Sequence, residues 1–532
     1  VQGDAQGDTY VNIQNVVGSA YDDLILASNA GGRIRGGAGN DSLYAGSGAD
    51  ILDGGAGTDT ASYTMSTAAI TANLFTGAAS GGYATGDTLS SIENLVGSQT
   101  YGDVLTGSVV ANTIEGRGGA DIDNVTYANS LVGVTVSLAR TTAQLSDGDA
   151  SGDILSNFEN LTGSGYDDVL TGDANANVIT GGAGDDILDG GAGADALDGG
   201  SGNDAASYAG SALGVTVDLG IDGAQSSAGD ADGDVLTLVE SLIGSAFADT
   251  LTGTAADNGL TGGAGDDVLI GLGGADMIDG GDGFDTADYS ASAEAVSVNL
   301  SMGAGLGGDA EGDTLTAVEN VTGSALDDTL TGDANANVLM GGDGNDVLAG
   351  RGGADVIDGG AGSNTVDYSA SAAAVTVNLS STNGARANAG AGVDGDAQGD
   401  TLTNIQNLIG SAYGDYIYAN AAGGTITAGS GSDDVVAGAG SDIVDGGTDS
   451  DTVNYAWSTG AVTVNLTTKT ASGSYAAGDV LTNIENVRGS NYNDVLTGDA
   501  RATTSSTAAP APTRSPMPTR PRPSGSGRTF TA

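Results

Sequence analysis

Short apolar segments alternate with glycine-rich turns along almost the whole chain, and the pattern recurs every nine residues. Between Gly181 and Ser207 three units follow one another as GGAGDDILD, GGAGADALD and GGSGNDAAS, each of the form Gly-Gly-x-Gly-x-Asp-x-apolar-x. The last three residues of a unit suit a short strand whose middle side chain, such as Leu188 or Leu197, points into a core. Because glycine is too frequent for helix interiors, we predict an all-β, mostly parallel solenoid.

The same nine-residue unit, or nonad, recurs far from this stretch. It is found as GGAGNDSLY (Gly36–Tyr44), GGAGDDVLI (Gly262–Ile270), GGDGNDVLA from Gly341 and, in weaker form, AGSGSDDVV (Ala428–Val436). Paired glycines reach positive φ without steric cost, so the chain can turn tightly and aim carbonyl oxygens inward. The aspartate adds an anionic oxygen, and Ca²⁺ takes six to eight oxygens at about 2.3–2.6 Å. One loop supplies too few ligands, so stacked loops must share ions.

These nonads resemble the RTX, or haemolysin-type, calcium-binding repeats. The resemblance implies a right-handed parallel β-roll with two nonads per coil and Ca²⁺ held between loops one coil apart, which pairs Asp186 with Asp204 and Asp41 with Asp59. The implied carboxylate ligands are Asp23, Asp41, Asp50, Asp59, Asp168, Asp186, Asp195, Asp204, Asp249, Asp267, Asp276, Asp285, Asp328, Asp346, Asp355, Asp433, Asp442 and Asp451. The implied carbonyl ligands are Gly37, Gly39, Gly182, Gly184, Gly191, Gly193, Gly263, Gly265, Gly342 and Gly344.

A longer period encloses the nonads. A tag of the form GDxxGD, partly degraded in places, ends at Asp8, Asp87, Asp153, Asp234, Asp313, Asp400 and Asp479, and a tyrosine follows it after 55 residues in five of six units. We interpret the constant spacing as stacked coils that admit no insertion, and the variable remainder as surface loops. The predicted divisions are super-repeats at 1–86, 87–152 (shortened), 153–233, 234–312, 313–399 and 400–478, a partial one at 479–500, and a tail at 501–532.

The ligand pattern varies between super-repeats. Asparagine replaces the sixth-position aspartate at Asn177, Asn258, Asn337 and Asn364, and we expect weaker calcium loops there. Gly32 and Gly424 supply no side-chain ligand. In the second super-repeat the nonads after Asp103 shrink to TGSVVANTI and EGRGGADID, and we expect calcium loops to be lost. The recurring tyrosines are predicted to pack at coil corners; a sugar-stacking row is the alternative.

Composition limits the functions that the chain can perform. It has 13 Lys and Arg against 69 Asp and Glu, a net charge of −56, and neither Cys nor His. Without cysteine or histidine there are no disulfides, no thiolate chemistry and no histidine-dependent triad or zinc-protease site. Such an acidic surface is a poor partner for nucleic acid and for anionic membranes. No apolar run is long enough to insert into a membrane.

The last 32 residues break the pattern. Residues 501–532 contain arginine and proline but no acid. An overlapping reading frame can encode a further nonad here, with its first aspartate nine residues beyond Asp494, so one hypothesis is a frameshift; a natural Pro/Ser/Thr linker is the alternative. In both cases we expect the tail to be disordered. The chain also opens inside a tag, at Gly3–Thr9, so we interpret it as part of a longer protein.

Two functions fit these observations. The first is a non-enzymatic, calcium-binding solenoid of a secreted or cell-surface structural or adhesive protein, with Ca²⁺ as its ligand and a surface glycan or further copies of itself as candidate partners. The resemblance implies type I secretion and folding on extracellular calcium. The second is the C-terminal repeat region of a type I-secreted exoenzyme whose catalytic domain lies outside this chain. Sugar or ice binding by flat β faces has no specific residues behind it.

Overall fold

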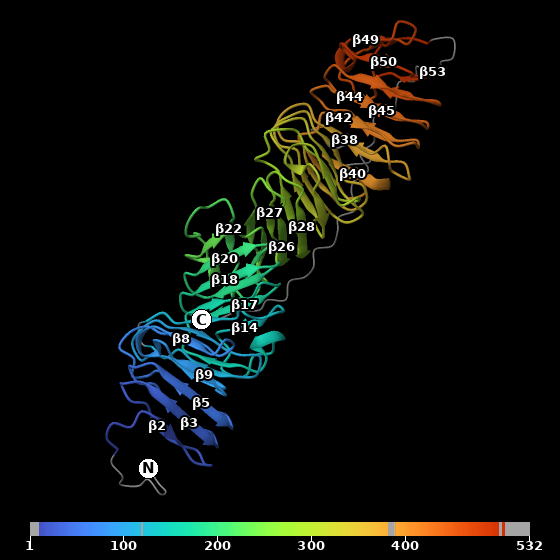
Figure 1. Ribbon diagram of the computed structural model, residues 1–532. Helices are drawn as coiled ribbons and strands as arrows, with labels where there is room; N and C mark the ends of the chain where they lie inside the picture. The colour runs from blue at the N-terminus through green and yellow to red at the C-terminus, as the bar shows by residue number, and fades with distance from the viewer. Residues whose placement is uncertain (1–9, 119–120, 381–387, 389, 499–502, 506–532) are drawn as a thin grey trace, which may run out of the picture. The chain divides into compact units, whose positions relative to one another are not determined.

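The computed structural model describes residues 10–118, 121–380, 388, 390–498 and 503–505. The chain divides into two compact units, the first formed by residues 1–333 and 337–346 and the second by residues 334–336 and 347–532. Each unit consists of very short strands stacked side by side in successive coils (Figure 1). The predicted all-β solenoid with parallel strands is confirmed.

Four runs of paired strands build the first unit. One contains, in spatial order, β1 (Val16–Val17), β3 (Gly32–Ala38), β5 (Asp50–Ala56), β9 (Thr88–Ser90), β8 (Ala78–Ser80), β7 (Thr71–Asn73), β11 (Val104–Thr106), β13 (Asn124–Thr126), β16 (Asn160–Thr162), β18 (Val178–Ala183), β20 (Ala196–Ser201) and β23 (Val235–Thr237). Another contains β15 (Ile154–Ser156), β12 (Thr113–Glu115), β10 (Asn94–Val96), β6 (Thr60–Ser62), β4 (Ser42–Tyr44) and β2 (Leu24–Leu26). The third contains β14 (Thr135–Ser137), β17 (Val169–Asp173), β19 (Ile187–Gly191), β21 (Ala205–Ser207), β24 (Ser241–Ile243), β26 (Gly259–Ala264), β28 (Met277–Asp282), β30 (Ser297–Asn299), β31 (Ala304–Leu306), β32 (Thr314–Thr316) and β34 (Thr329–Thr331). The fourth contains β22 (Thr216–Asp218), β25 (Thr250–Thr252), β27 (Val268–Ile270), β29 (Thr286–Asp288), β33 (Asn320–Thr322) and β35 (Val338–Met340).

Two runs build the second unit in the same way. One contains β36 (Val347–Ala349), β38 (Thr365–Asp367), β42 (Asn407–Ile409), β44 (Thr425–Thr427), β46 (Ile443–Asp445), β48 (Thr463–Asn465), β49 (Thr470–Ser472), β50 (Val480–Thr482) and β52 (Val495–Thr497). The other contains β37 (Val356–Asp358), β41 (Thr401–Thr403), β40 (Ala391–Val393), β39 (Thr376–Asn378), β43 (Tyr416–Tyr418), β45 (Asp434–Val436), β47 (Thr452–Asn454), β51 (Asn486–Arg488) and β53 (Thr503–Ser505).

Strand register shows that one coil takes two nonads. Strand β17 pairs with β19, placing Leu170 beside Leu188, while β18 pairs with β20, placing Ile179 beside Leu197. Successive nonads therefore lie in different sheets, and each residue meets its equivalent 18 positions later. In most of the described strands an apolar residue near the middle is buried and the residue before it is more exposed: Leu188 is 0% exposed and Ile187 39%. Because side chains alternate between the two faces of a strand, this pattern produces a thin core of stacked aliphatic side chains.

Antiparallel hairpins and short turns interrupt the parallel coils where the predicted variable loops lie. Strand β7 pairs antiparallel with β8, and the pairs β30 with β31, β39 with β40 and β48 with β49 repeat this arrangement. Next to the tags lie 3₁₀ turns at η1 (Gly82–Ala84), η2 (Gly148–Ala150), η3 (Gly229–Ala231), η4 (Gly308–Ala310), η5 (Gly395–Ala397) and η6 (Ser474–Ala476). The coils thus absorb insertions at one place without losing register.

Five of the six recurring tyrosines bind the last aspartate of a tag through a hydroxyl hydrogen bond, Tyr63 being the exception. All six are buried, as predicted for packed side chains at coil corners: Tyr63, Tyr127, Tyr208, Tyr289, Tyr368 and Tyr455 are at most 2% exposed. The Tyr289 hydroxyl donates a hydrogen bond of 2.8 Å to Oδ2 of Asp313, the last residue of its tag. Oδ1 of the same carboxylate accepts a hydrogen bond from the backbone N–H of Asp276 in the coil before. The tag aspartate therefore occupies the next position in the stack of aspartates that the nonads form.

The tail begins with regular structure, contrary to expectation. Strand β53 pairs in parallel with β51, placing Thr503 beside Asn486. The parallel pairing therefore continues into the first residues of the predicted disordered segment. Residues 506–532, on which the frameshift and linker hypotheses mainly bear, lie outside the described residues.

Candidate metal sites

The sixth-position aspartates are charged side chains in buried positions. Of the predicted carboxylate ligands, Asp23 is partly exposed, and the others are at most 3% exposed. Burying a carboxylate is costly unless a counter-charge and hydrogen bonds compensate it. Among the described residues the ion pairs join Arg33 and Arg35 to Asp53, and Arg117 to Glu115. For the predicted ligands other than Asp346 and Asp355, the side chains of the described residues therefore supply no counter-charge.

In the nonads, one carboxylate oxygen of the aspartate accepts a backbone hydrogen bond from the coil before it. The backbone N–H of Asp186 donates to Oδ1 of Asp204 at 2.8 Å, and that of Asp41 donates to Oδ1 of Asp59 at 2.7 Å. These two pairs, 18 residues apart, are the ones that the resemblance implies. The N–H of Asp168 likewise donates to Asp186. Each aspartate thus bridges consecutive coils through its backbone and its side chain together.

The second carboxylate oxygen has no hydrogen-bond partner in most nonads. In the described part of the chain this holds for buried Oδ2 of Asp41, Asp59, Asp186, Asp195, Asp204, Asp267, Asp276, Asp285, Asp433 and Asp451. At Asp50 and Asp442, Oδ2 accepts a hydrogen bond from the glycine N–H four residues earlier, and Oδ1 has no partner. Buried polar atoms are normally satisfied, so a repeated exception of one kind points to a missing ligand.

The unsatisfied oxygen lies beside the first glycine of the nonad. A Cβ atom on Gly181 would lie 2.2 Å from Asp186 Oδ2 and 2.7 Å from the carbonyl oxygen of Gly199, one coil on. On Gly36 it would lie 2.1 Å from Asp41 Oδ2 and 2.5 Å from the carbonyl oxygen of Gly54. These are close to calcium–oxygen distances. The first glycine is therefore needed because a Cβ would occupy the space between the two oxygens.

Sequence reasoning missed these first-position carbonyls, which belong to residues such as Gly54, Gly199 and Gly280. A signal was available: the second and fourth glycines of the nonads have positive φ, which explains them, but Gly36 and Gly181 do not. A glycine without a conformational reason indicates close approach of other atoms. All ten glycines predicted as carbonyl ligands have φ between +77° and +153°. The carbonyl oxygen of Gly182 lies 2.2 Å from the position of a Cβ on Gly200, so it faces the next coil.

The first aspartate in each series of stacked aspartates has a different environment. Oδ2 of Asp168 accepts a hydrogen bond from Ser164 N–H and Oδ1 accepts one from Val134 N–H. Asp249 and Asp328 repeat both bonds, and Asp23 accepts from Ser19 N–H. These carboxylates are largely satisfied by the protein and cap a turn. Their assignment as metal ligands remains a prediction.

The asparagine loops have a different hydrogen-bond pattern from the aspartate loops. Asn177 accepts a hydrogen bond from Asp173 N–H through Oδ1 and donates one through Nδ2 to the Glu159 carbonyl oxygen at 2.8 Å. Asn258 makes the equivalent donation to the carbonyl oxygen of Glu240. An amide supplies an N–H where a carboxylate supplies a second acceptor. These asparagines are thus satisfied within the protein rather than simply being poorer metal ligands.

The second super-repeat retains one carboxylate of the nonad type. Asp103 N–H donates to Oδ1 of Asp123 at 2.7 Å over 20 residues instead of 18. Oδ2 of Asp123 is buried without a partner. Asn112 takes the satisfied form, donating to the Glu93 carbonyl oxygen. The expected loss of calcium loops therefore does not extend to the carboxylate of Asp123.

Burial and like charges raise the pKa of the nonad carboxyl groups. Burial, reinforced by the charges of Asp168 and Asp204, raises the pKa of Asp186 to about 7. Burial, with the charge of Asp234 or of Asp313, likewise raises the pKa of Asp195 and of Asp276 to about 7. No group of three or more acidic side chains converges on one point among the described residues. A bound cation would therefore need backbone carbonyl oxygens or water in addition to carboxylates.

The comparison with protein families agrees with this geometry. The model described as the RTX calcium-binding nonapeptide repeat matches residues 27–61, 156–188, 171–205, 239–269, 252–287, 322–357, 331–366 and 418–453. The chain carries RTX calcium-binding repeats. RTX repeats bind calcium, several ions to a chain, and the matched stretches contain the aspartates named above with unsatisfied oxygens, except Asp123. None of the curated proteins compared with the chain matches it.

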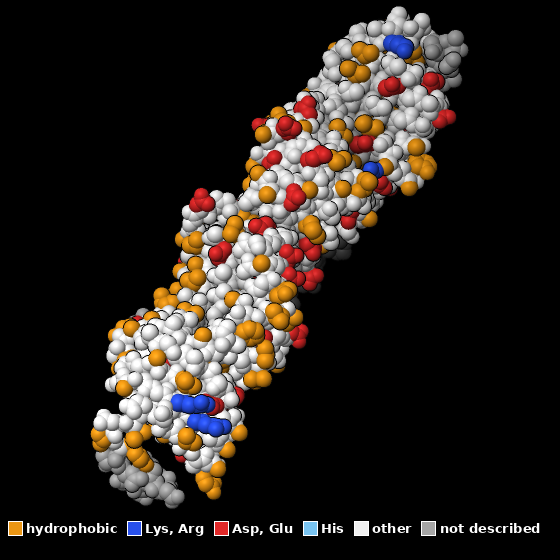
Figure 2. All heavy atoms as spheres, viewed as in Figure 1, with side chains coloured by type: hydrophobic (Ala, Val, Ile, Leu, Met, Phe, Trp, Pro, Cys, Tyr) orange, Lys and Arg blue, Asp and Glu red, His pale blue; other side chains and the backbone are white. Residues whose placement is uncertain are grey.

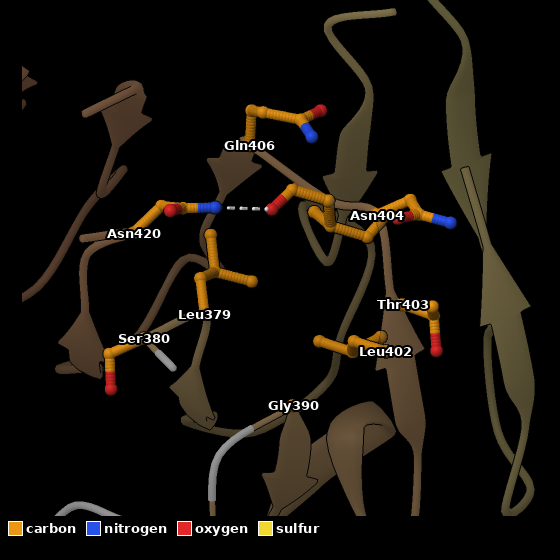
Figure 3. A pocket seen from close by; sticks show the side chains of 9 residues that line it. Leu379, Ser380, Gly390, Leu402, Thr403, Asn404, Gln406 and Asn420 are labelled. Carbon is orange, nitrogen blue, oxygen red and sulfur yellow. Dashed lines mark hydrogen bonds between the residues drawn. The ribbon is translucent and has the colours of Figure 1, made fainter. Parts of the chain in front are cut away.

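The described residues also form clefts away from the stacked aspartates, and the larger of the two best formed lies in the second unit. A cleft of about 410 Å³ in the second unit is lined by Leu379, Ser380, Gly390, Leu402, Thr403, Asn404, Ile405, Gln406 and Asn420 (Figure 3). None of these side chains is charged, so the cleft offers neither a general acid nor a base. No helix in the described part of the RTX repeat chain is long and apolar enough to cross a membrane.

Replacing Gly181 by alanine tests whether calcium binds in the space between the two oxygens beside the first glycine of the nonad. The new Cβ would fill the space between Asp186 Oδ2 and Gly199 O, so Gly181→Ala should lower the number of bound calcium ions and raise the calcium concentration needed for folding. Isothermal titration calorimetry of the full chain measures both. Gly165→Ala is the matched control, because a Cβ on Gly165 meets nothing within 4 Å. Equal calcium binding by the two variants would contradict the assignment.

The raised pKa values predict an unusual dependence on pH without calcium. The unfolded carboxyl groups titrate near 3.8 and the folded ones near 7. The metal-free fold therefore binds more protons than the unfolded chain in this window, so it gains stability as pH falls from about 8 to about 5. With calcium the sign reverses, because protons compete for the ligands. Far-UV circular dichroism in calcium-free and calcium-saturated buffers tests this. A metal-free β signal that declines on acidification is the contrary result.

Proposed function

We propose that this chain is the calcium-binding β-solenoid region of a secreted or cell-surface structural or adhesive protein, and that it folds on binding extracellular calcium. The row of buried carboxylate oxygens, repeated coil after coil without a partner, is the observation that carries the proposal. These oxygens make the fold incomplete without cations. A secreted chain meets such cations only after it has left the cell.

Electrostatics supports coupling between calcium binding and folding. The chain carries a net charge of −56, and the stacked coils bring its aspartates together at a spacing of one coil. Self-repulsion of this kind disfavours the compact state. An ion that binds only the folded chain stabilises it by about 2.7 kcal/mol at a hundred times its dissociation constant, and several sites add such contributions. Extracellular calcium modules bind with dissociation constants of about 10⁻⁴ to 10⁻³ M.

The surface suits a structural or adhesive role better than catalysis. Figure 2 shows acidic side chains scattered over the viewed face and few basic ones. Apolar side chains flank the buried strand positions, among them Val178 at 44% exposure and Met277 at 70%. A surface glycan or another copy of the chain is a candidate partner for these strand faces. The repeats would perform the same folding role beside an exoenzyme, so the sequence that flanks them distinguishes the two functions.

Chymotrypsin tests folding on calcium, because the chain carries tyrosines of opposite exposure. Tyr208 and Tyr289 are 2% exposed, whereas Tyr21 is 79% exposed. At about 10⁻³ M Ca²⁺ cleavage after Tyr208 and Tyr289 should be suppressed, and in chelator both should be cut rapidly, as measured by mass spectrometry of the fragments. Cleavage after Tyr21 in both buffers is the internal control. Equal protection of the buried tyrosines in chelator would overturn the proposal.

A further inference from the structure

The last nonad of each super-repeat is not followed by another nonad one coil on. In the third super-repeat the backbone N–H of Asp204 instead donates to Glu240 Oε2 at 3.0 Å, 36 residues later. The equivalent pairs are Asp59 with Glu93, Asp123 with Glu159, Asp285 with Glu319 and Asp451 with Glu485. A glutamate therefore replaces the next aspartate in the stack, and the loop around it has no nonad glycines.

This loop brings a different carbonyl to the unsatisfied carboxylate. A Cβ on Gly199 would lie 2.1 Å from the carbonyl oxygen of Leu238 and 2.7 Å from Asp204 Oδ2. We call the space between these two oxygens the junction cradle. Asp204 is 0% exposed and its Oδ2 has no partner. Leu238 has φ of +50°, a left-handed conformation that a leucine adopts only at a cost.

The same geometry recurs at four further junctions. Ser91, Asn157, Ala317 and Asn483 also have left-handed φ, between +49° and +57°. A Cβ on the facing glycine would lie 2.0–2.3 Å from their carbonyl oxygens and 2.6–2.8 Å from Oδ2 of the aspartate. The aspartates concerned, Asp59, Asp123, Asp285 and Asp451, are at most 1% exposed, and their Oδ2 atoms lack partners. In each cradle, therefore, the aspartate Oδ2 and the left-handed carbonyl oxygen face the same space, and neither of these two atoms can donate a hydrogen bond to the other.

In the fifth super-repeat an amide group, rather than an ion, satisfies the corresponding oxygen. Asn364 replaces the aspartate and Gln406 replaces the glutamate, and the Asn364 N–H still donates to Gln406 Oε1 at 2.7 Å. The Asn364 amide Nδ2 donates to the carbonyl oxygen of left-handed Asn404 at 3.2 Å. Nearby, Asn420 Nδ2 donates to the Ile405 carbonyl oxygen (Figure 3). The substitution removes two negative charges and supplies the missing donor at once.

This contrast identifies what the other junctions lack. Asn177 and Asn258 likewise donate to backbone carbonyl oxygens, so amides fill this role elsewhere in the coils. Where the acid pair is retained, the two extra charges match a divalent cation. The left-handed carbonyl is also present at the amide junction, where Asn404 accepts the hydrogen bond of Asn364, so a cation would take the place of that donor at the other five.

We propose that the five junction cradles containing Asp59, Asp123, Asp204, Asp285 and Asp451 bind calcium through the aspartate Oδ2 and the left-handed carbonyl oxygen, and that the Asn364 amide replaces the ion at the fifth. These sites extend the calcium row beyond the nonads, across the boundary between super-repeats. The inference rests on the proposed calcium-dependent folding, which can hold without it.

Exchanging the two junction types tests the inference on the full chain with Ca²⁺ alone. The double variant Asp204→Asn with Glu240→Gln should lose one bound ion, and Asn364→Asp with Gln406→Glu should gain one. Native mass spectrometry at saturating calcium counts the ions directly. Asp222→Asn with Glu294→Gln is the control, because it removes the same charge at exposed residues outside any cradle and should leave the count unchanged.

The outcomes separate this inference from the proposed function. A calcium count that neither exchange changes, in a chain that still binds calcium and folds, overturns the junction sites alone. A chain that binds no calcium in any form overturns the proposed function instead. If the Asp204→Asn variant fails to fold, the reverse exchange at Asn364 and Gln406 still decides, because a count equal to that of the unmodified chain contradicts the proposal.

Discussion

The structure depends on the two oxygens of one aspartate having opposite tasks. In Asp204, as in its equivalents, Oδ1 accepts a backbone hydrogen bond from the coil before, while Oδ2 faces a carbonyl oxygen and has no donor. The first bond makes the coils stack at a spacing of 18 residues. The second oxygen makes the stack electrostatically incomplete. Folding and cation binding are therefore requirements of the same side chain.

The apolar core cannot compensate for this on its own. A typical strand buries one apolar side chain, such as Leu188 or Leu197, and leaves the residues next to it more exposed. A core one side chain deep on each strand buries little apolar area for each carboxylate that it removes from water. Where an ion is absent, the chain uses other donors: a tyrosine hydroxyl at Asp313 and an amide at Asn364. An ion, a hydroxyl group and an amide group can each satisfy an acceptor that would otherwise be buried without a partner.

Sequence periodicity predicted most of the fold because the nonad is a local rule. Glycine pairs, the sixth aspartate and the x-apolar-x strand each follow from the conformation of nine residues, and stacking two per coil follows from their repetition. The paired aspartates, such as Asp186 with Asp204, lie together as the resemblance implied. Asp123, shifted by two residues, was missed because it breaks the period while keeping its place in the stack.

The ligand field was predicted less completely, because it depends on which atoms face one another between coils. Glu93 and Glu240 take the place of the next aspartate in the stack, yet nothing local marks them as successors of an aspartate 34 or 36 residues earlier. The left-handed carbonyl of Leu238 has no sequence signal, since serine, asparagine and alanine take its place elsewhere. Asn364 was interpreted as a weak ligand, whereas its amide donates to a carbonyl oxygen. Only the three-dimensional stack distinguishes a ligand from a donor that replaces an ion.

A calcium titration followed by far-UV circular dichroism, with Mg²⁺ in parallel, tests the central claim most directly. If the unsatisfied carboxylate oxygens make the fold incomplete, the full chain at neutral pH should change cooperatively from a disordered to a β-rich spectrum with Ca²⁺. Mg²⁺ should not substitute, because it requires near-ideal octahedral geometry and shorter distances. A chain that is already β-rich in chelator and does not respond to calcium would show that its apolar core suffices, contradicting the account.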